Sequence, residues 1–299
     1  MEKAPKKVGI VILSWNQADD TIKCLDSLDK VKYENYDTLL IDNGSVDDSL
    51  SRILKTHPGI RHIKNTHNLG FTGGCNAGMK KALEEGADYV LLLNNDVVVD
   101  PEFLTELVRA AESDPKIGIV GPKIYYYGKD NVIWAAGDKE EKVFKRFVHI
   151  GGGKKDRGQF SKQKDVDIMS ACAALIKKEV IQDVGYLNDD YFRTAEDIEY
   201  CIRAKKAGYR IIFVPSSKIW HKGSAATGGE KSPQNEYYGL RNILYLVKMY
   251  HRKSLSYVLL KYYIKYVFLL IIGPRKRAEA VLDAILDFKN DKQGKSSKY

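Results

Sequence analysis

The chain has 299 residues, of which 44% are hydrophobic, and its formal net charge is +9. This length and apolar fraction suffice for one large α/β domain or two smaller ones, and they exclude a disordered or fibrous protein. The charge lies in the C-terminal part, because residues 241 to 299 hold 13 Lys or Arg against 4 Asp or Glu and so account for the whole surplus.

Cysteine usage and the N-terminus both favour a cytoplasmic protein. The four cysteines form no C-x-x-C pair, so neither a zinc ribbon nor a disulfide framework is indicated. The N-terminus passes from a charged leader straight into a strand-like run, without the apolar segment and cleavage site of a signal peptide. No nucleic-acid-binding motif accompanies the basic tail, and we therefore expect no nucleic-acid partner.

The predicted elements alternate between strand and helix along the first third of the chain. The strands are expected at residues 8 to 13, 38 to 41, 60 to 64 and 88 to 93, with helices opening at Asp19 or Asp20 and covering 47 to 56 and 74 to 85. This order predicts an α/β fold with a mostly parallel sheet. Ligands of such sheets bind beyond the carboxyl ends of the strands.

The second part of the chain is less regular. Asp100 and Pro101 predict the start of a helix that runs to about Glu112. Residues 117 to 170 are rich in strand-like and turn-like stretches. A helix at 195 to 206 and a strand at 210 to 214 follow.

Three polar loops directly follow predicted strands, at residues 14 to 16, 42 to 45 and 94 to 96. Asp42 is placed to accept hydrogen bonds from a ribose or a base edge. Asp96 is placed to hold a divalent cation bound to a diphosphate. Because Asp, Asn, Gly and Ser are also common in ordinary turns and caps, each loop alone leaves both interpretations open.

Two further polar groups lie about a hundred residues later. Glu196 and Asp197 begin a predicted helix, whose positive end favours ionised carboxylates, although capping explains them equally well. His221 follows the last predicted strand and with Asp96 would make a Mg²⁺ or Mn²⁺ pair. A lone histidine is more often structural.

Residues 67 to 78 (HNLGFTGGCNAG) combine four glycines with a predicted helix. Their spacing is not the dinucleotide fingerprint, which follows the first strand, so a dehydrogenase loses its main support. Gly73 and Gly74 at the helix start indicate close approach of the backbone to a ligand. Gly78, inside the helix, indicates close packing of the helix on the sheet.

Nine short motifs follow one another in order: VILSWNQ, IDNGSVDDS, NTHNLGFTGGCNAG, LLLNNDV, GPKIYY, DRGQF, AEDIEYCIRAKKAGYRI, IWHKGS and YYGLRN. From about residue 7 to 245 they resemble the family 2 glycosyltransferases with the GT-A fold, and within them the rhamnosyltransferase-like branch that builds bacterial surface polysaccharides. The resemblance implies a glycosyltransferase domain over residues 1 to 235. Its nucleotide-sugar-binding half would be 1 to 115 and its acceptor-binding, catalytic half 116 to 235.

The resemblance also implies roles for single residues. Asp96 corresponds to the metal-binding aspartate of the D-x-D motif, His221 to a histidine that helps hold the metal, and Asp197, beside Glu196, to the general base of the E-D motif. The sequence departs from the family where Asn94 replaces the first acid of D-x-D and Glu199 the last acid of E-D-x-D. The implied nucleotide-binding residues are Ser14, Asn16, Asp42, Asn43, Asn68, Gly70, Gly73, Gly74 and Asn95.

The expected activity is inverting, metal-dependent transfer of a sugar from dTDP-rhamnose or a UDP-sugar to a glycan or lipid-linked glycan. A nucleotidyltransferase is a first alternative, but the loop after the first strand lacks the usual glycine-rich, basic signature. A second alternative is a catalytically silent glycan-binding or scaffold subunit at the membrane.

The tail, residues 236 to 299, is predicted to be helical, basic and amphipathic. Between Leu255 and Ile272 the longest run without a charge, from Tyr266 to Ile272, is shorter than the roughly 20 residues that a membrane span needs. With Lys261 and Lys265 on one face, the segment suits a helix lying on an anionic membrane. A helix packed on the protein, or a dimer contact, is the alternative.

Overall fold

The structure is a computed structural model that describes residues 4 to 141, 146 to 223 and 232 to 299. The described strands are β1 (Val8–Ser14), β2 (Tyr36–Asp42), β3 (Arg61–Lys64), β4 (Tyr89–Asn94), β5 (Val97–Val99), β6 (Ile117–Tyr126), β7 (Ile133–Ala135), β8 (Asp138–Glu141), β9 (Arg146–His149), β10 (Lys164–Asp165), β11 (Ala173–Lys177) and β12 (Arg210–His221). The described helices are α1 (Ala18–Leu28), α2 (Ser49–Thr56), α3 (Gly70–Glu84), α4 (Phe103–Glu112), α5 (Lys178–Val184), η1 (Asp189–Tyr191), α6 (Glu196–Lys206), α7 (Pro233–Tyr250), η3 (Arg252–Ser254), α8 (Leu255–Ile272) and α9 (Arg275–Lys289).

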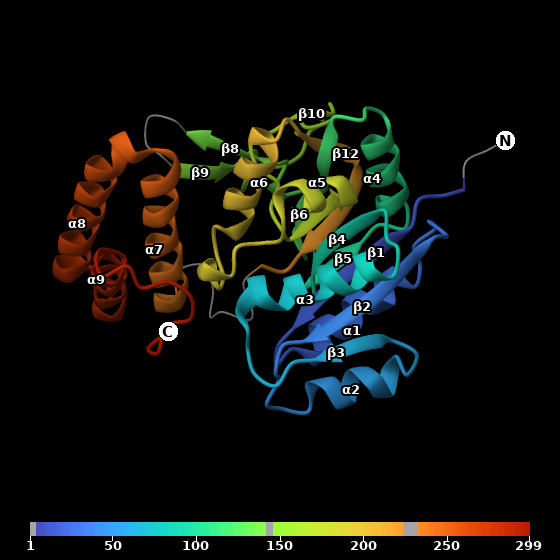
Figure 1. The fold of residues 1–299 in the computed structure, drawn as a ribbon, viewed down its shortest axis with the longest axis horizontal. Coiled ribbons are helices and arrows are strands. Elements are labelled where there is room, and N and C mark those ends of the chain that lie inside the picture. The colour runs from blue at the N-terminus through green and yellow to red at the C-terminus, as the bar shows by residue number, and fades with distance from the viewer. Residues whose placement is uncertain (1–3, 142–145, 224–231) are drawn as a thin grey trace.

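One ten-stranded sheet forms the centre of the molecule, with the main order β10-β12-β6-β11-β4-β1-β2-β3 (Figure 1). Strands β4, β1, β2 and β3 are parallel neighbours, and β12 is parallel to β6. Strand β11 runs antiparallel between β4 and β6, and the short strands β5, β7 and β10 also pair antiparallel. The predicted α/β fold with a mostly parallel sheet is confirmed.

Three boundaries differ from the sequence prediction. Helix α4 begins at Phe103, after Glu102 in the N-cap position, whereas the sequence predicts its start at Asp100 and Pro101. Helix α3 begins at Gly70, whereas the prediction placed its start at residue 74. Strand β12 continues to His221, because it pairs with β6 first and then, beyond a register shift, also with β5. The last residue of the IWHKGS motif, Ser224, lies outside the described residues.

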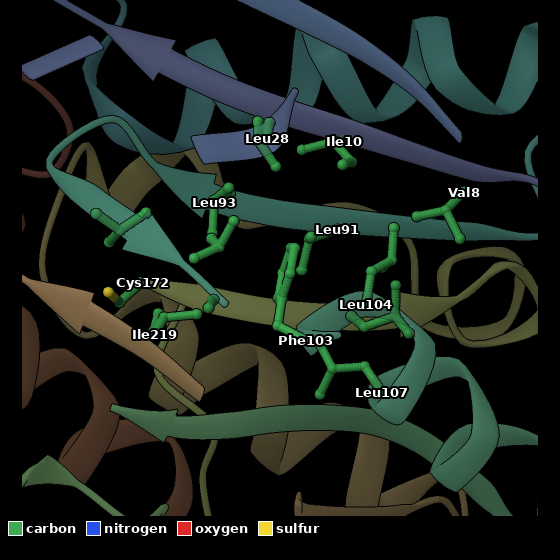
Figure 2. Close-up of a cluster of buried hydrophobic side chains, with 14 of the residues drawn as sticks. Val8, Ile10, Leu28, Leu91, Leu93, Phe103, Leu104, Leu107, Cys172 and Ile219 are labelled. Atoms are coloured by element: carbon green, nitrogen blue, oxygen red, sulfur yellow. The ribbon is translucent and has the colours of Figure 1, made fainter. Parts of the chain in front are cut away.

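Apolar side chains alternate between the two faces of the sheet. In β4, Leu91 and Leu93 point to the face covered by α1, α2 and α4, where Phe103 is fully buried (Figure 2). Leu92 of the same strand points to the other face, where it joins the side chains of α3, α5 and α6, including Met79. Burying one such large side chain stabilises the fold by about 1.5 to 3 kcal/mol.

Helices α7, α8 and α9 build a third apolar cluster beside the sheet domain (Figure 1). Leu244 of α7 and Ile285 of α9 are fully buried in it. The cluster reaches the sheet domain through Phe192, whose ring stacks on Tyr238 of α7 at 5.3 Å between centroids. The tail is therefore packed onto the loop that precedes α6.

Helix α8 has a polarity opposite to that of most surface helices. Its Lys265 pairs with Glu236 of α7, which also binds Arg277 of α9, so this lysine faces the protein and not a membrane surface. The outward face is apolar, with Ile264 and Ile271 exposed by 62% and 76%. By length and composition the helical stretch Arg252–Ile272 suffices to cross a membrane, with a mean hydropathy of 1.7 over a window of 18 residues, which the short charge-free run did not predict.

Candidate active site

A pocket of about 730 Å³ opens at the carboxyl ends of β1 and β4, where ligands of parallel sheets bind. The chain reaches it from separate segments: the turn after β4, the end of β12, the start of α6, and the loops after β1 and β2. Residues at the start of α7, Gln234 and Asn235, also line it, as do Lys295 and Tyr299, which follow α9. The motifs that the sequence placed far apart thus meet at one cavity.

Asp96 and His221 lie side by side in the pocket because β5 pairs with the end of β12, with His221 opposite Val97. His221 Nε2 is 3.1 Å from Asp96 Oδ1, and both side chains are at least nine-tenths buried. The two side chains are at ion-pair distance, and neither Asp96 Oδ1 nor the two ring nitrogens make a hydrogen bond among the described residues. A carboxylate and the nitrogen of a neutral imidazole are ligands that fit a divalent cation, and Asn94 also lines the pocket.

Glu196 and Asp197 form the first turn of α6 and both line the pocket. Asp197 accepts hydrogen bonds from the backbone amides of Ile198, at 2.8 Å, and Ala171, at 3.3 Å. Glu196 Oε2 has no hydrogen-bond partner among the described residues.

Burial decides the ionisation of this pair. It raises the pKa of Glu196, which the adjacent Asp197 charge raises further, and it raises the pKa of Asp197, with Asp138 adding to the effect. The sequence prediction that the helix end favours ionised carboxylates therefore misses the larger effect, which is desolvation. Carboxyl groups with pKa values moved toward neutrality are suited to proton transfer.

Four of the predicted nucleotide-binding residues line the pocket: Asn43, Asn68, Gly70 and Asn95. The Asn43 amide donates to Asn68 Oδ1 and to the Gly70 carbonyl, and Asn68 Oδ1 also accepts from the Gly70 amide. Asn95 donates to Thr21 of α1. These side chains are held by the protein before any ligand arrives.

Three other predicted nucleotide-binding residues, Ser14, Asn16 and Asp42, are not among the described residues that line the pocket. The Ser14 hydroxyl is buried against that of Thr21, at 2.9 Å. Asn16, with a φ of 52°, accepts a hydrogen bond from the Val46 amide and so ties the loop after β1 to the loop after β2. Asp42 is buried and accepts from the Ser45 amide, while its Oδ2 has no partner among the described residues. Each of them shapes a loop beside the pocket.

The glycines of the segment 67 to 78 serve packing more than the sequence predicted. A Cβ atom on Gly74 would lie 2.2 Å from Leu13 Cδ1, and one on Gly78 would lie 2.3 Å from Val11 Cγ1. One on Gly73 would meet Leu69 of its own segment at 2.9 Å, and neither Gly73 nor Gly74 lines the pocket in the described chain. Helix α3 needs Gly74 and Gly78 to lie close to β1.

Several pocket residues escaped the sequence prediction. Trp134 contacts His221 edge-on at 4.7 Å and His149 at 4.1 Å between ring centroids, and His149 Nδ1 pairs with the buried Asp138. Arg193, before α6, and Trp15, after β1, also line the cavity. Trp134 and His149 lie on the short strands β7 and β9, and Trp15 and Arg193 lie on loops. The sequence shows no periodic or spacing signal that would mark these positions.

The DRGQF motif has a structural explanation. The Asp156 carboxylate accepts hydrogen bonds from Lys123 Nζ and the Tyr125 hydroxyl, each at 2.8 Å. Lys123 and Asp156 are both more than nine-tenths buried, and both tyrosine and lysine belong to the GPKIYY motif. The two motifs therefore fasten the loop at 151 to 158 to β6.

A separate group of potential metal ligands consists of Asp26, Asp29 and His57. His57 Nε2 is 3.3 Å from Asp26 and 3.6 Å from Asp29. Both carboxylates are exposed, and none of the three lines the pocket. We assign no role to this surface cluster.

Comparison with known proteins gives the family. The model of "Glycosyl transferase family 2" matches residues 9 to 185, more than half of the chain. An N-acetylglucosaminyl-diphospho-decaprenol L-rhamnosyltransferase of Mycobacterium tuberculosis is 23% identical over 239 residues, covering 73% of this chain and 77% of that protein. An uncharacterised protein, y4gI of Sinorhizobium fredii, is 28% identical over 73% of this chain, but the match spans only 24% of its own length.

A solved structure supports the fold independently. The crystal structure of GalNAc-T7 with UDP, GalNAc and Mn²⁺ superposes with a TM-score of 0.66 at 18% identity, covering 83% of this chain and 48% of that one. The chain, with its α/β sheet and GT-A fold, belongs to glycosyl transferase family 2.

Proposed function

We propose that the protein is an inverting, divalent-metal-dependent glycosyltransferase that moves a sugar from a nucleotide diphosphate sugar to a hydroxyl group. The observation that carries this proposal is the convergence of Asp96, His221, Glu196 and Asp197 on one pocket. Such a transfer needs a metal-binding pair and a proton-accepting carboxylate, and Asp96 with His221 and Asp197 would supply them.

Asp197 is the general base in this proposal. The acceptor oxygen attacks the anomeric carbon, its proton passes to Asp197, and the bond from that carbon to the diphosphate breaks. Two backbone amides hold the carboxylate in place, and such a base contributes on the order of 10² to 10⁴ in rate. Burial keeps Glu196 protonated, which spares the base a second negative charge beside it. One carboxylate base favours direct displacement, which inverts the anomeric centre.

Asp96 and His221 would hold the metal, Mn²⁺ or Mg²⁺, together with oxygens of the donor. When bound, the ion neutralises charge that accumulates on the leaving diphosphate. The polar atoms of these two side chains that make no hydrogen bond within the described part of the chain support this assignment. Asn94 offers an amide oxygen in place of the first acid of the D-x-D motif.

The donor is dTDP-rhamnose or a UDP-sugar in this proposal. Two similarities support it: the rhamnosyltransferase relative, and the UDP in the GalNAc-T7 structure. Residues 1 to 115 would bind the nucleotide sugar, with Asn43, Asn68 and Asn95 beside it, and residues 116 to 235 the acceptor. Trp15 is 38% exposed and offers an aromatic face to the same cavity.

The acceptor is a glycan or lipid-linked glycan, which the enzyme meets at the inner face of the cell membrane. Helix α8 supports the membrane contact, since its outward face carries exposed Leu260, Ile264, Val267, Phe268 and Ile271. Exposed basic residues flank this face at both ends: Arg252, Lys253, Arg275 and Lys276. Apolar side chains between positive charges fit the interface of an anionic bilayer.

Vesicle flotation tests the membrane contact. The protein should float with vesicles that contain anionic lipid and much less with neutral ones. An Ile264→Ser, Phe268→Ser double variant should stay behind, whereas Val46→Ser, which changes an exposed side chain of a loop in the sheet domain, should float as before. Flotation of the double variant equal to that of the wild type would contradict the proposal. A wild-type dimer that the double variant abolishes and Val46→Ser keeps would also contradict it, because the apolar face would then bind a second copy of the chain.

Turnover tests the reaction itself. Release of nucleoside diphosphate is measured with each donor sugar, and the anomeric configuration of the product is read by NMR. Asp197→Asn should abolish transfer while nucleotide binding survives. Nucleotide binding without turnover for every donor and acceptor would favour the silent glycan-binding or scaffold subunit.

A further inference from the structure

The loop that carries the proposed base has an unusual backbone. Between η1 and α6, three non-glycine residues have positive φ angles: Phe192 at 58°, Thr194 at 68° and Ala195 at 69°. Side chains disfavour this left-handed region, so such residues persist only where surrounding contacts hold them. Ala195 is directly followed by Glu196 and Asp197, and the loop conformation thus sets where the two carboxylates point.

One side chain of the tail donates hydrogen bonds to three backbone carbonyls of this loop. The Asn242 amide nitrogen of α7 donates to the carbonyls of Tyr191, Arg193 and Thr194, at 2.8, 2.7 and 2.8 Å. Asn242 is 1% exposed, so water cannot replace it. Without it, three inward-facing carbonyls would lose a donor, which is costly inside a protein.

The neighbouring Arg241 fixes the orientation of this amide. Its Nε and Nη2 both donate to Asn242 Oδ1, at 3.1 and 3.0 Å, which turns the amide nitrogen toward the loop. Arg241 Nη1 donates to the Gly294 carbonyl and to the Tyr237 hydroxyl, which itself donates to Asp287 of α9. A chain of hydrogen bonds therefore runs from α9 and the segment after it to the loop that precedes the base.

We propose that Asn242 is a positioning residue for the base and that Arg241 orients it, so the helical tail is part of the catalytic apparatus. The inference rests on the proposed function for the identity of the reaction. It also gives a role to the last two residues of the YYGLRN motif. Arg241 orients the side-chain amide of Asn242, and that amide holds the loop before α6.

Asn242→Asp tests the inference at constant size, because it keeps the oxygen that Arg241 needs and replaces the donor with an acceptor facing three carbonyls. We expect kcat to fall on the order of 10²-fold, as when a catalytic group is misplaced by about 1 Å. The thermal shift caused by nucleotide should stay unchanged. Hydrogen exchange of residues 190 to 198 should become faster.

Leu244→Ala is the matched control, since it empties a fully buried apolar site on the same helix and leaves the hydrogen-bonding groups of Asn242 and Arg241 in place. It should lower the melting temperature and leave kcat and the exchange of residues 190 to 198 as in the wild type. Ala195→Gly, which relieves one left-handed residue, should restore part of the activity of the Asn242→Asp variant.

The inference would be wrong if Asn242→Asp and Leu244→Ala lost stability equally and also lost kcat equally. It would also be wrong if hydrogen exchange of residues 190 to 198 were unchanged in Asn242→Asp. If Asn242→Asp does not fold, Asn242→Ala is compared in the same way. If the wild type transfers no sugar, the proposed function fails, while the exchange comparison still decides whether Asn242 holds the loop.

Discussion

Replacing Glu196 with glutamine isolates the energetic cost of burying a carboxyl group beside the proposed base. Burial, and then the Asp197 charge, raise the pKa of Glu196 from 4.5 to about 8. The folded protein therefore keeps this proton across neutral pH, whereas the unfolded chain releases it above about 4.5. Because the unfolded state then binds fewer protons, the free energy of unfolding must fall as pH rises between the two values.

The size of the effect follows from the same values. Each pH unit inside this window removes about 1.4 kcal/mol from the free energy of unfolding. From pH 5 to pH 7 the wild type should therefore lose about 2 to 3 kcal/mol relative to Glu196→Gln, which has the same size and no proton to release. Urea denaturation of both proteins in the presence of a chelator measures this difference.

A control and a refutation complete the experiment. Glu84→Gln removes an exposed carboxyl from α3 and should show no such divergence from the wild type. If the wild type and Glu196→Gln keep a constant difference in stability over the window, Glu196 is ionised in the folded protein. Desolvation would then not determine the ionisation of Glu196 and Asp197.

The transfer rate should fall as pH falls through about 6, because burial raises the pKa of Asp197 to about 6 and the base must be ionised; a rate that is flat between pH 5 and pH 7 would count against Asp197. Gly78→Ala should destabilise the protein by about 1 to 3 kcal/mol, since its Cβ would press on a valine methyl group of β1. Gly59→Ala, which meets open space, should leave the melting temperature unchanged. Asp156→Asn should cost about 3 to 5 kcal/mol because Lys123 would remain buried without its charge partner; a loss below about 1 kcal/mol, typical of exposed pairs, would disprove that reasoning.

The sheet and its order of elements could be predicted because their signals are local. Alternating apolar residues in β4, such as Leu91 and Leu92, and the apolar face of each helix follow from geometry that a sequence displays directly. Polar residues after strands could likewise be placed at one edge of a parallel sheet. Asp96 and His221 do meet there, and so do Glu196 and Asp197.

Other parts of the site depend on tertiary contacts that no spacing announces. His149 enters the pocket from the short strand β9, where it pairs with Asp138 of β8, and Arg193 enters from a loop that Asn242 of α7 holds. Gly74 looked like a ligand-binding glycine because both uses, ligand approach and helix docking, exclude a side chain.

Helix α8 shows the same limit of local reasoning. Sequence spacing placed Lys261 and Lys265 on one face but did not reveal which way that face points. The partner that turns Lys265 inward, Glu236, lies on another helix, as does Arg277, which shares it.

The central claim is that the pocket binds a nucleotide through a metal held by Asp96 and His221. The measurement that tests it most directly is the melting temperature with UDP, dTDP and GDP, each with and without Mn²⁺, for the wild type and for Asp96→Asn. A ligand that binds only the folded state raises the melting temperature by mass action. We predict that one nucleotide raises that of the wild type, that Mn²⁺ enlarges the shift, and that Asp96→Asn removes the enlargement. No shift with any nucleotide, at concentrations well above a plausible dissociation constant, would contradict the claim.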